Sequence, residues 1–469
     1  MSSLNELSIV EAGKKLAAGE ITAVQLAEAC LSEIEKKNPS LNAYLEVFAD
    51  VREQAKVADE RRAAGESHPL LGIPLAIKDN ILIEGRVASA ASKMLQNYVA
   101  TYDATVIKKL KSVGTVFLGR TNMDEFALGG STENSAFGVT KNPHDPSRVA
   151  GGTSGGSAAA VAAHMALGAL GTDTGGSIRN PASFCGVVGL KPTYGAVSRS
   201  GLIAAVSSFD QIGPITKTVE DAEILFEAIR GKDSLDSTSI DEKLYPKTKE
   251  KKVIGVMKMS VETAKENAEA VNATVQLSVV IVKKLEAKGF KVIEVEIPAT
   301  ALALASYYIT NFAEVSTNLS RFDGVRYGLS VKGDSLIEDY AKSREEGFGP
   351  ETRRRIMLGT YVLSAGYYDA YYAKAVTARE QLRKEYEKAF KDVDAILTPT
   401  MPTPAWKVGE KTTPLSAYLA DAFTVPANLT GNPAISIPMG EVDGLPVGLQ
   451  LTAAHGDEAT LFRVGKELQ

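Results

Sequence analysis

The feature that most constrains the fold of this chain is a segment of small residues from Gly129 to Gly213. Glycine, serine and alanine dominate the segment and long charged side chains are scarce, a composition that flexible linkers share. The same segment also carries large apolar residues at core-like positions, among them Val161, Leu170 and Phe184. A linker has no core to fill, so we expect this segment to form tightly packed backbone inside the protein.

Helices and strands alternate on both sides of this segment. Apolar residues at helical spacing predict helices over 22–37, 50–64, 104–112, 219–229 and 261–287, and a polar stretch over 353–390 is also predicted to be helical. Short apolar runs predict strands over 71–77, 115–118, 253–257, 291–297, 394–397, 433–438 and 446–451. The alternation predicts an α/β fold.

The chain has 469 residues, enough for about three domains of ~150 residues. No clear linker interrupts the alternation, and the charged loop over 231–252 is the one candidate hinge. We therefore expect one domain over 1–469, with N-terminal helices over 1–65, a Gly/Ser-rich core over 71–215 and a C-terminal part over 250–469.

The composition excludes several classes of function. Lys and Arg total 52 against 57 Asp and Glu, a net charge of −5, so the chain has no basic field for holding a nucleic acid. Four histidines and two cysteines leave little material for a metal site. No run is long and apolar enough to span a membrane, and the N-terminus has no signal-peptide core, so we expect a cytoplasmic protein without a metal.

A first candidate for chemistry is the glycine-rich loop over 151–157, which precedes an alanine-rich helix. Free amides at a helix N-terminus can hold anions or oxyanions, although the same pattern also caps purely structural helices. The loop lacks the lysine of a phosphate-binding loop. It matches the Gly-x-Ser-x-Gly nucleophile elbow, but the preceding residues form a weak strand and the one late histidine, His455, follows the last apolar run.

A second candidate is the loop over 171–181, in which Ser177 follows two glycines. Small residues leave the amides of residues 174–177 uncovered, as an oxyanion hole requires, although such serines are often turn caps. A serine needs a base, and with few histidines the base must be a carboxylate or a desolvated lysine. Lys78, at the end of the apolar strand over 71–77, fits because burial lowers the pKa of an amine.

Lys78, the loop over 151–157 and the run over 175–179, with Ser177 placed 24 positions after Thr153, together resemble the amidase signature family. The resemblance implies one large mixed β-sheet covered by helices and hydrolysis of carboxamides by a Ser-Ser-Lys triad. Ser177 matches the nucleophile, Lys78 the base and Thr153 the bridging hydroxyl.

Further blocks are similar to one branch of that family, the glutamine-hydrolysing subunits of tRNA-dependent amidotransferases. These blocks span nearly the whole chain and lie at 77–80, 120–126, 131–138, 190–195, 320–328, 364–372 and 444–450.

One residue departs from the family pattern, because Thr153 stands where the family usually has serine. Threonine keeps the hydroxyl and adds a methyl group that restricts χ1. We expect Thr153 to relay the proton and the neighbouring Ser154 to be structural.

The resemblance also implies roles for further residues. The oxyanion would be held by backbone amides at Thr174, Gly175 and Gly176. Glutamine would be selected by Gly129, Ser131, Asp421 for its ammonium group, and Arg354 or Arg355 for its carboxylate.

The implied partners are a B subunit and a small C subunit in a heterotrimer. The B subunit would bind tRNA and use ATP and Mg²⁺ to amidate Glu-tRNA(Gln) and, in some complexes, Asp-tRNA(Asn), while this chain would need no cofactor. Two alternatives stay open: a stand-alone amidase of the same family, and a non-catalytic scaffold subunit.

Overall fold

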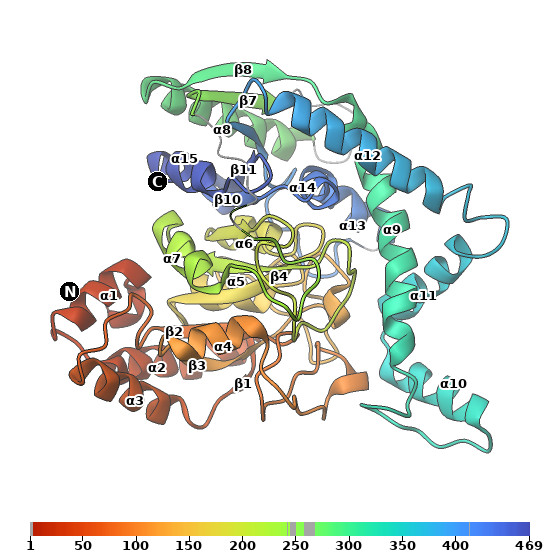
Figure 1. Cartoon of the computed structure of the whole chain (residues 1–469), viewed down its shortest axis with the longest axis horizontal. Coiled ribbons are helices and arrows are strands. Elements are labelled where there is room, and N and C mark those ends of the chain that lie inside the picture. Colours follow the sequence, from red (N-terminus) through yellow and green to blue (C-terminus); the bar gives the residue numbers. More distant parts are fainter. Residues whose placement is uncertain (1–2, 242, 244–249, 258–267, 412) are drawn as a thin grey trace.

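The computed structural model describes residues 3–241, 243, 250–257, 268–411 and 413–469. Its centre is a sheet of 11 strands in the order β1-β3-β2-β4-β6-β5-β10-β11-β9-β7-β8 (Figure 1). The strands are β1 (Tyr44–Val47), β2 (Pro74–Lys78), β3 (Val116–Thr121), β4 (Gly168–Asp173), β5 (Val188–Lys191), β6 (Gln211–Thr216), β7 (Val253–Met257), β8 (Lys291–Val295), β9 (Ala395–Pro399), β10 (Ala434–Val442) and β11 (Leu445–Ala453).

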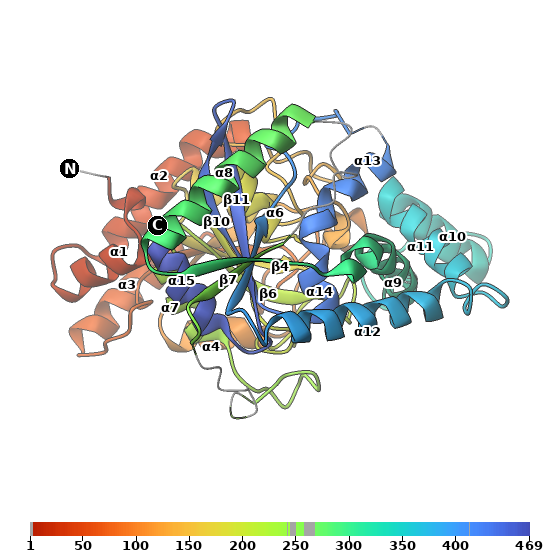
Figure 2. The same cartoon turned by 90° about the horizontal axis from the view of Figure 1, so that it is seen from above.

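The α-helices surround this sheet (Figure 2). They are α1 (Ile9–Ala17), α2 (Ala23–Leu41), α3 (Val51–Ala63), α4 (Thr105–Ser112), α5 (Gly155–Ala162), α6 (Arg179–Cys185), α7 (Val219–Ile229), α8 (Ala268–Ala287), α9 (Ala303–Asn318), α10 (Leu336–Gly347), α11 (Pro350–Val362), α12 (Tyr372–Ala389), α13 (Pro414–Tyr418), α14 (Val425–Thr430) and α15 (Glu458–Leu468). The first three helices lie at the left of Figure 1, and α9, α10 and α11 form a column at its right. The expected fold, a large mixed sheet covered by helices, is confirmed.

The order of the strands brings two distant segments together at one sheet edge. Strand β2 lies between β3 and β4 and is parallel to both. Parallel neighbours end at the same edge, so Lys78 at the end of β2 lies beside Thr172 and Asp173 at the end of β4.

The segment of small residues from Gly129 to Gly213 forms the middle of the molecule, as expected. It supplies β4, β5 and the first half of β6, and helices α5 and α6 pack directly on the sheet. Glycine is required where these helices approach each other, because a Cβ at Gly152, which has φ +52°, would lie 2.3 Å from Pro181 Cδ. Close packing of backbone is thus the reason for the composition.

The predicted helix over 353–390 is wrong in one respect, because it is two helices. Helix α11 ends at Val362 and α12 begins at Tyr372, with Gly366 at φ +86° in the connection. Both helices pack against α9, so each half buries its own face and the chain must turn between them. For the helix expected over 261–287, residues 261–267 lie outside the described part of the chain.

Two large hydrophobic clusters fill the molecule. The larger lies around the central sheet, and the second lies under α9, α11 and α12, where Tyr307, Phe348 and Leu382 are buried. Among the described residues, no helix is both long enough and apolar enough to cross a membrane.

Candidate active site

Strand β2 delivers a fully buried lysine to the sheet edge. Lys78 has no exposed area, and its Nζ donates to Thr153 Oγ1 at 2.8 Å, Ser154 Oγ at 2.8 Å and Thr172 Oγ1 at 2.7 Å. Burial lowers the pKa of Lys78 to about 7, although three buried carboxylates act against this shift. Near neutral pH a substantial fraction of this amine is therefore uncharged and able to accept a proton.

The two hydroxyls of the first glycine loop differ in their surroundings. Ser154 Oγ donates to the carbonyl of Thr172 at 3.0 Å and accepts from its amide at 3.2 Å, which ties the start of α5 to β4. In the described part of the chain, Thr153 Oγ1 has no hydrogen-bond partner other than Lys78. The hydroxyl proton of Thr153 is therefore available to a third group, whereas that of Ser154 is used by the backbone.

Ser177 lies between the second glycine loop and α6. It is 7% exposed, and its carbonyl accepts a hydrogen bond from Ser154 N at 3.1 Å, so the two loops are joined. No described residue is hydrogen-bonded to Ser177 Oγ. Residues 150–154 form a loop rather than the end of a strand, which argues against the nucleophile elbow.

The amides expected to form an oxyanion hole are not all uncovered. Gly176 N donates to Asp173 Oδ1 at 2.9 Å, so the expectation is wrong for Gly176. The carboxylate at the end of β4 takes this amide because the turn from Thr174 to Ser177 folds around it. The amides of Thr174 and Gly175 donate no hydrogen bond to any described residue.

A cavity of about 230 Å³ is lined by all five residues expected to bind substrate. Its walls include Gly129, Ser131, Arg354, Arg355 and Asp421, together with Tyr308, Glu351, Trp406 and Tyr418. The cavity borders the first glycine loop, because the carbonyl of Gly130 in its wall accepts from Gly152 N at 2.9 Å. Tertiary structure thus brings residues from three distant parts of the sequence to one cavity that borders the first glycine loop.

A buried carboxylate shapes the loop on one wall of the cavity. Asp124 accepts hydrogen bonds from the backbone amides of Ser131, Thr132 and Asn134 at 3.3, 2.9 and 2.8 Å. Burial raises the pKa of Asp124 to about 6, against the effect of these amides. Asp124 therefore positions the loop that carries Gly129 and Ser131.

Arg354 and Arg355 of α11 lie in different environments. Arg355 is 3% exposed and donates to Glu351 Oε1 at 2.7 Å and to Asn311 Oδ1 at 3.0 Å. Its guanidinium also lies within 6 Å of the rings of Tyr308 and Tyr418. Arg354 is 42% exposed and has one described ion-pair partner, Glu351. Arg354 can therefore turn toward a ligand, while Arg355 is held by the protein.

Asp421 faces the cavity and lacks a cationic hydrogen-bond partner among the described residues. Its Oδ2 accepts from Tyr308 OH at 2.6 Å, and burial raises the pKa of Asp421 to about 7. A ligand cation beside this carboxylate would favour its charged form. The site is suited to an ammonium group.

Several residues of the site carried no sequence signal that we used. Thr172 and Asp173 lie in the second glycine loop, but nothing in that loop indicated contacts with Lys78 or with backbone amides. Tyr308 and Glu351 lie on α9 and α11 among many similar residues, and only the packing of these helices brings them to the cavity. Within the described ranges, no group of three or more His, Cys, Asp and Glu side chains could hold a metal ion.

Comparisons with known proteins agree with this architecture. Residues 25–462 match the family model described as Amidase. The A subunit of the glutamyl-tRNA(Gln) amidotransferase of Desulfatibacillum aliphaticivorans is 51% identical, covering 100% of this chain and 97% of that protein. The chain belongs to the amidase family, and the resemblance to the amidase signature family is confirmed.

Two solved structures define the similarity further. The crystal structure of the A subunit of the glutamyl-tRNA(Gln) amidotransferase from Thermotoga maritima has a TM-score of 0.80 at 42% identity, covering 99% of this chain and 94% of that one. The peptide amidase of Stenotrophomonas maltophilia has a TM-score of 0.81 at 29% identity, covering 99% and 96%. The fold is thus shared with both kinds of enzyme, and of these two the amidotransferase protein has the higher identity.

Proposed function

We propose that this chain is the glutamine-hydrolysing subunit of a tRNA-dependent amidotransferase. The observation that carries the proposal is the contact of the buried Lys78 amine with the Thr153 hydroxyl at 2.8 Å, beside a cavity that holds Arg354 and Asp421. An arginine and a carboxylate suit the two charges of a free α-amino acid. The names of the most similar relatives support glutamine as that amino acid.

The proposed reaction begins with attack of Ser177 Oγ on the side-chain carbonyl carbon of glutamine. The serine proton passes to Thr153 Oγ1, whose own proton passes to the neutral amine of Lys78. The amides of Thr174 and Gly175 stabilise the oxyanion. Ammonia leaves with the returned proton, and water then hydrolyses the glutamyl ester through the same groups.

Arg354 is the arginine that we assign to the substrate carboxylate. Its guanidinium is exposed at the cavity, whereas that of Arg355 is fixed by Glu351, Asn311 and aromatic rings. Asp421 binds the substrate ammonium group. Gly129 and Ser131 form the wall that Asp124 holds in place.

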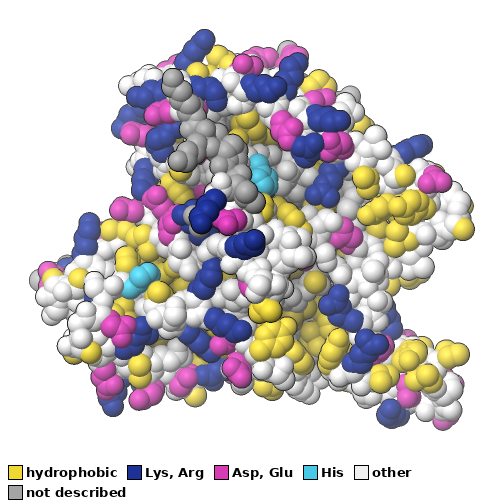
Figure 3. Space-filling view, viewed as in Figure 1, with side chains coloured by type: hydrophobic (Ala, Val, Ile, Leu, Met, Phe, Trp, Pro, Cys, Tyr) yellow, Lys and Arg dark blue, Asp and Glu magenta, His cyan; other side chains and the backbone are white. Residues whose placement is uncertain are grey.

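The ammonia would pass to a B subunit that binds tRNA and uses ATP and Mg²⁺, with a small C subunit completing the complex. The net charge of −5 supports this division of labour, and Figure 3 shows acidic and basic side chains interspersed on the face in view. Such a surface leaves tRNA binding to the partner. Cytoplasmic location follows from the same proposal.

The experiment compares the purified chain with its Ser177→Ala variant. We expect glutamine hydrolysis by the wild type and none by the variant, with a faster rate once the B and C subunits, ATP and Glu-tRNA(Gln) are present. The complex should then convert Glu-tRNA(Gln) to Gln-tRNA(Gln). Absence of that conversion with intact glutaminase activity would refute the amidotransferase assignment.

The same experiment addresses the two alternatives. The similarity to a peptide amidase keeps a stand-alone amidase in consideration, and that enzyme would hydrolyse varied amides without stimulation by partners. A non-catalytic scaffold would not form an ester at Ser177. The contacts of Lys78 with Thr153 and Ser154 argue against a scaffold, because burying an amine costs free energy that the binding of partners does not require.

A further inference from the structure

Arg179 follows the nucleophile by two residues and uses every hydrogen-bond donor of its side chain. Its Nε donates to Asp173 at 3.1 Å, and its Nη2 donates to Asp173 at 2.9 Å and to Asn428 at 2.7 Å. Its Nη1 donates to the carbonyl of Thr424 at 2.9 Å and to Gln450 at 2.6 Å. The side chains of Arg179 and Asp173 have no exposed area.

Asp173 holds the nucleophile turn on one side of this arginine. Its carboxylate accepts from Gly176 N at 2.9 Å and from Ile178 N at 3.1 Å, the amides on either side of Ser177. Burial raises the pKa of Asp173, but the charge and hydrogen bonds of Arg179 outweigh it and keep the pKa below its usual range. The Asp173 carboxylate therefore stays ionised at neutral pH and holds the turn through these two amides.

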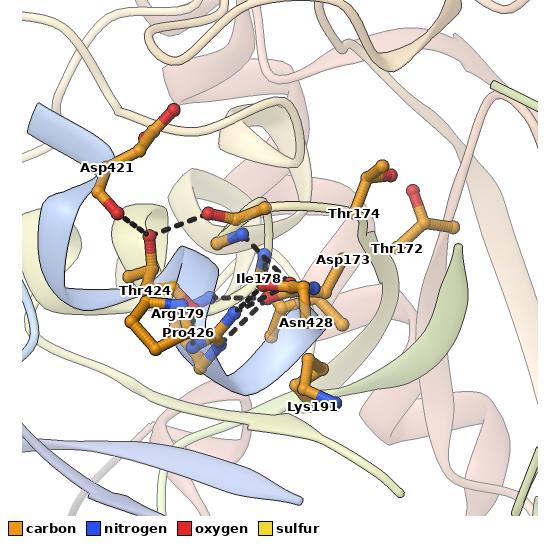
Figure 4. Close-up of polar contacts among 12 residues, drawn as sticks. Thr172, Asp173, Thr174, Ile178, Arg179, Lys191, Asp421, Thr424, Pro426 and Asn428 are labelled. Atoms are coloured by element: carbon orange, nitrogen blue, oxygen red, sulfur yellow. Dashed lines mark hydrogen bonds and ion pairs between the residues drawn. The ribbon is translucent and has the colours of Figure 1, made fainter. Parts of the chain in front are cut away.

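The other side of Arg179 contacts the segment that carries Asp421. Thr424 N donates to the carbonyl of Asp421 at 3.1 Å, and Thr424 Oγ1 donates to the carbonyl of Gly175 at 2.6 Å. Figure 4 shows Arg179 between Thr424 and Asp173, with Asn428 beside Asp173 and Asp421 beyond Thr424. One guanidinium thus touches both the turn of the nucleophile and the segment of the ammonium-binding residue.

We propose that Arg179 is a positioning residue that fixes the distance between Asp421, which binds the α-ammonium group of the substrate, and the nucleophile Ser177. The inference rests on the proposed function, in which Asp421 binds the α-ammonium group of glutamine and Ser177 attacks its side-chain amide. These two ends of the substrate are a fixed number of bonds apart. Holding Asp421 and Ser177 in a constant relation therefore places the amide within reach of the nucleophile.

The chemistry of arginine suits this role. Five donors in a planar group can satisfy partners from β4, α14 and β11 at the same time. Lysine offers three donors from one atom and cannot hold these partners in the same geometry. Removal of Arg179 would leave the Asp173 carboxylate buried without its cation, which is strongly destabilising, so the decisive variants lie elsewhere.

The decisive variant is Asn428→Ala, with Thr430→Ala as its matched control. Both side chains are buried on α14, but among the described residues the Thr430 hydroxyl bonds only to its own helix, at the carbonyl of Pro426. In Asn428→Ala the Asp173 carboxylate loses the hydrogen bond from Asn428 Nδ2 at 2.8 Å but keeps those from Arg179 and from the amides of Gly176 and Ile178, so the nucleophile turn stays held. We expect kcat for glutamine to fall about tenfold or more with little change in KM, and Thr430→Ala to match the wild type.

A second measurement separates positioning from general damage. The probe is a small fluorophosphonate, which reacts with Ser177 and has no group for Asp421. We expect Asn428→Ala to be labelled at the wild-type rate, and Arg179→Lys to lose both labelling and glutamine hydrolysis. The acid limb of the pH profile should be the same in wild type and Asn428→Ala, because Lys78 is not disturbed.

Each other outcome has a defined meaning. Equal losses of labelling and kcat in Asn428→Ala would overturn the inference in favour of a structural role, and unchanged kcat would overturn it as well. A wild type that labels at Ser177 but does not hydrolyse glutamine would instead refute the proposed substrate. Failure of the two proposals can therefore be told apart.

Discussion

At the scale of single residues, the two hydroxyl groups that contact Lys78 differ in whether their protons are already donated to the backbone. Ser154 gives its proton to the carbonyl of Thr172, so its hydroxyl joins α5 to β4. Thr153 has no such acceptor among the described residues, and its hydroxyl contacts the amine directly. The extra methyl group of threonine limits the rotation of this hydroxyl without removing it.

We expect Thr153→Ala to lower kcat for glutamine by about 10²-fold to 10⁴-fold, because the proton relay from Ser177 to Lys78 loses its middle group. Ser154→Ala should retain most of the activity, since its hydroxyl has a structural acceptor, and Thr153→Ser should restore the relay. Steady-state kinetics of the three variants provides the measurement. A larger loss in Ser154→Ala than in Thr153→Ala would contradict the assignment.

Two groups with a pKa of about 7 should control the pH dependence of the reaction. Lys78 must be neutral to accept a proton, and Asp421 must be ionised to bind an ammonium group. Both conditions are lost as pH falls through about 7, so the plot of log kcat/KM against pH should approach a slope of about 2 at low pH. Asp421→Asn removes one group and should leave a slope of about 1; an unchanged slope would exclude Asp421 from the profile.

At the scale of elements, α11 places two neighbouring arginines in opposite roles. Its N-terminal Glu351 lies one helical turn before Arg354 and Arg355 and ion-pairs with both. The helix packs on α9, so the side of Arg355 faces the rings of Tyr308 and Phe312, while Arg354 lies at the cavity mouth. Helix position alone decides which cation is available to a ligand.

We expect Arg354→Gln to raise the KM for glutamine roughly tenfold to a hundredfold, the loss of a charge-assisted hydrogen bond of about 1.5–3 kcal/mol, without lowering the melting temperature. Arg355→Gln should lower the melting temperature, because it leaves the buried Glu351 without its buried cationic partner. Kinetics and thermal denaturation of both variants test this pair. Reversal of the two effects would show that Arg355 is the substrate ligand.

At the scale of the whole molecule, the sheet joins the C-terminal part of the chain to the Gly/Ser-rich core. Strand β10 from the C-terminal part pairs with β5 from the core, and β11 and β9 continue the sheet outward. The C-terminal part cannot be separated without breaking these pairings. We therefore propose that the chain is one folding unit.

The single tryptophan, Trp406, offers a test of this proposal. It packs edge-on against Phe184 of α6, with ring centroids 5.2 Å apart, so its fluorescence reports on contact between the C-terminal part and the core. We expect denaturant unfolding followed by this fluorescence to coincide with unfolding followed by circular dichroism. Two separated transitions would indicate independent domains.

Much of the site could be predicted from the sequence because its chemistry depends on rare residue types. A lysine after an apolar strand and a serine in a glycine loop indicated Lys78 and Ser177, and the resemblance supplied Thr153, Asp421 and the pair Arg354 and Arg355. The break between α11 and α12 was missed, because a helical pattern does not reveal where each half meets α9. The loss of the Gly176 amide to Asp173 was missed for a similar reason, since loop composition does not specify hydrogen-bond partners.

The sequence by itself determined the class of fold, the family and the residue types of the candidate site, since these follow from local periodicity and from motifs. Only the tertiary structure decided that Arg354 is exposed while Arg355 is buried, and that Thr153, unlike Ser154, has no backbone acceptor for its proton among the described residues. It also showed that Arg179 joins the turn of Ser177 to the segment of Asp421. The physical reason is that each of these properties depends on partners far away in the sequence, which only the packing of β4, α11 and α14 brings into contact.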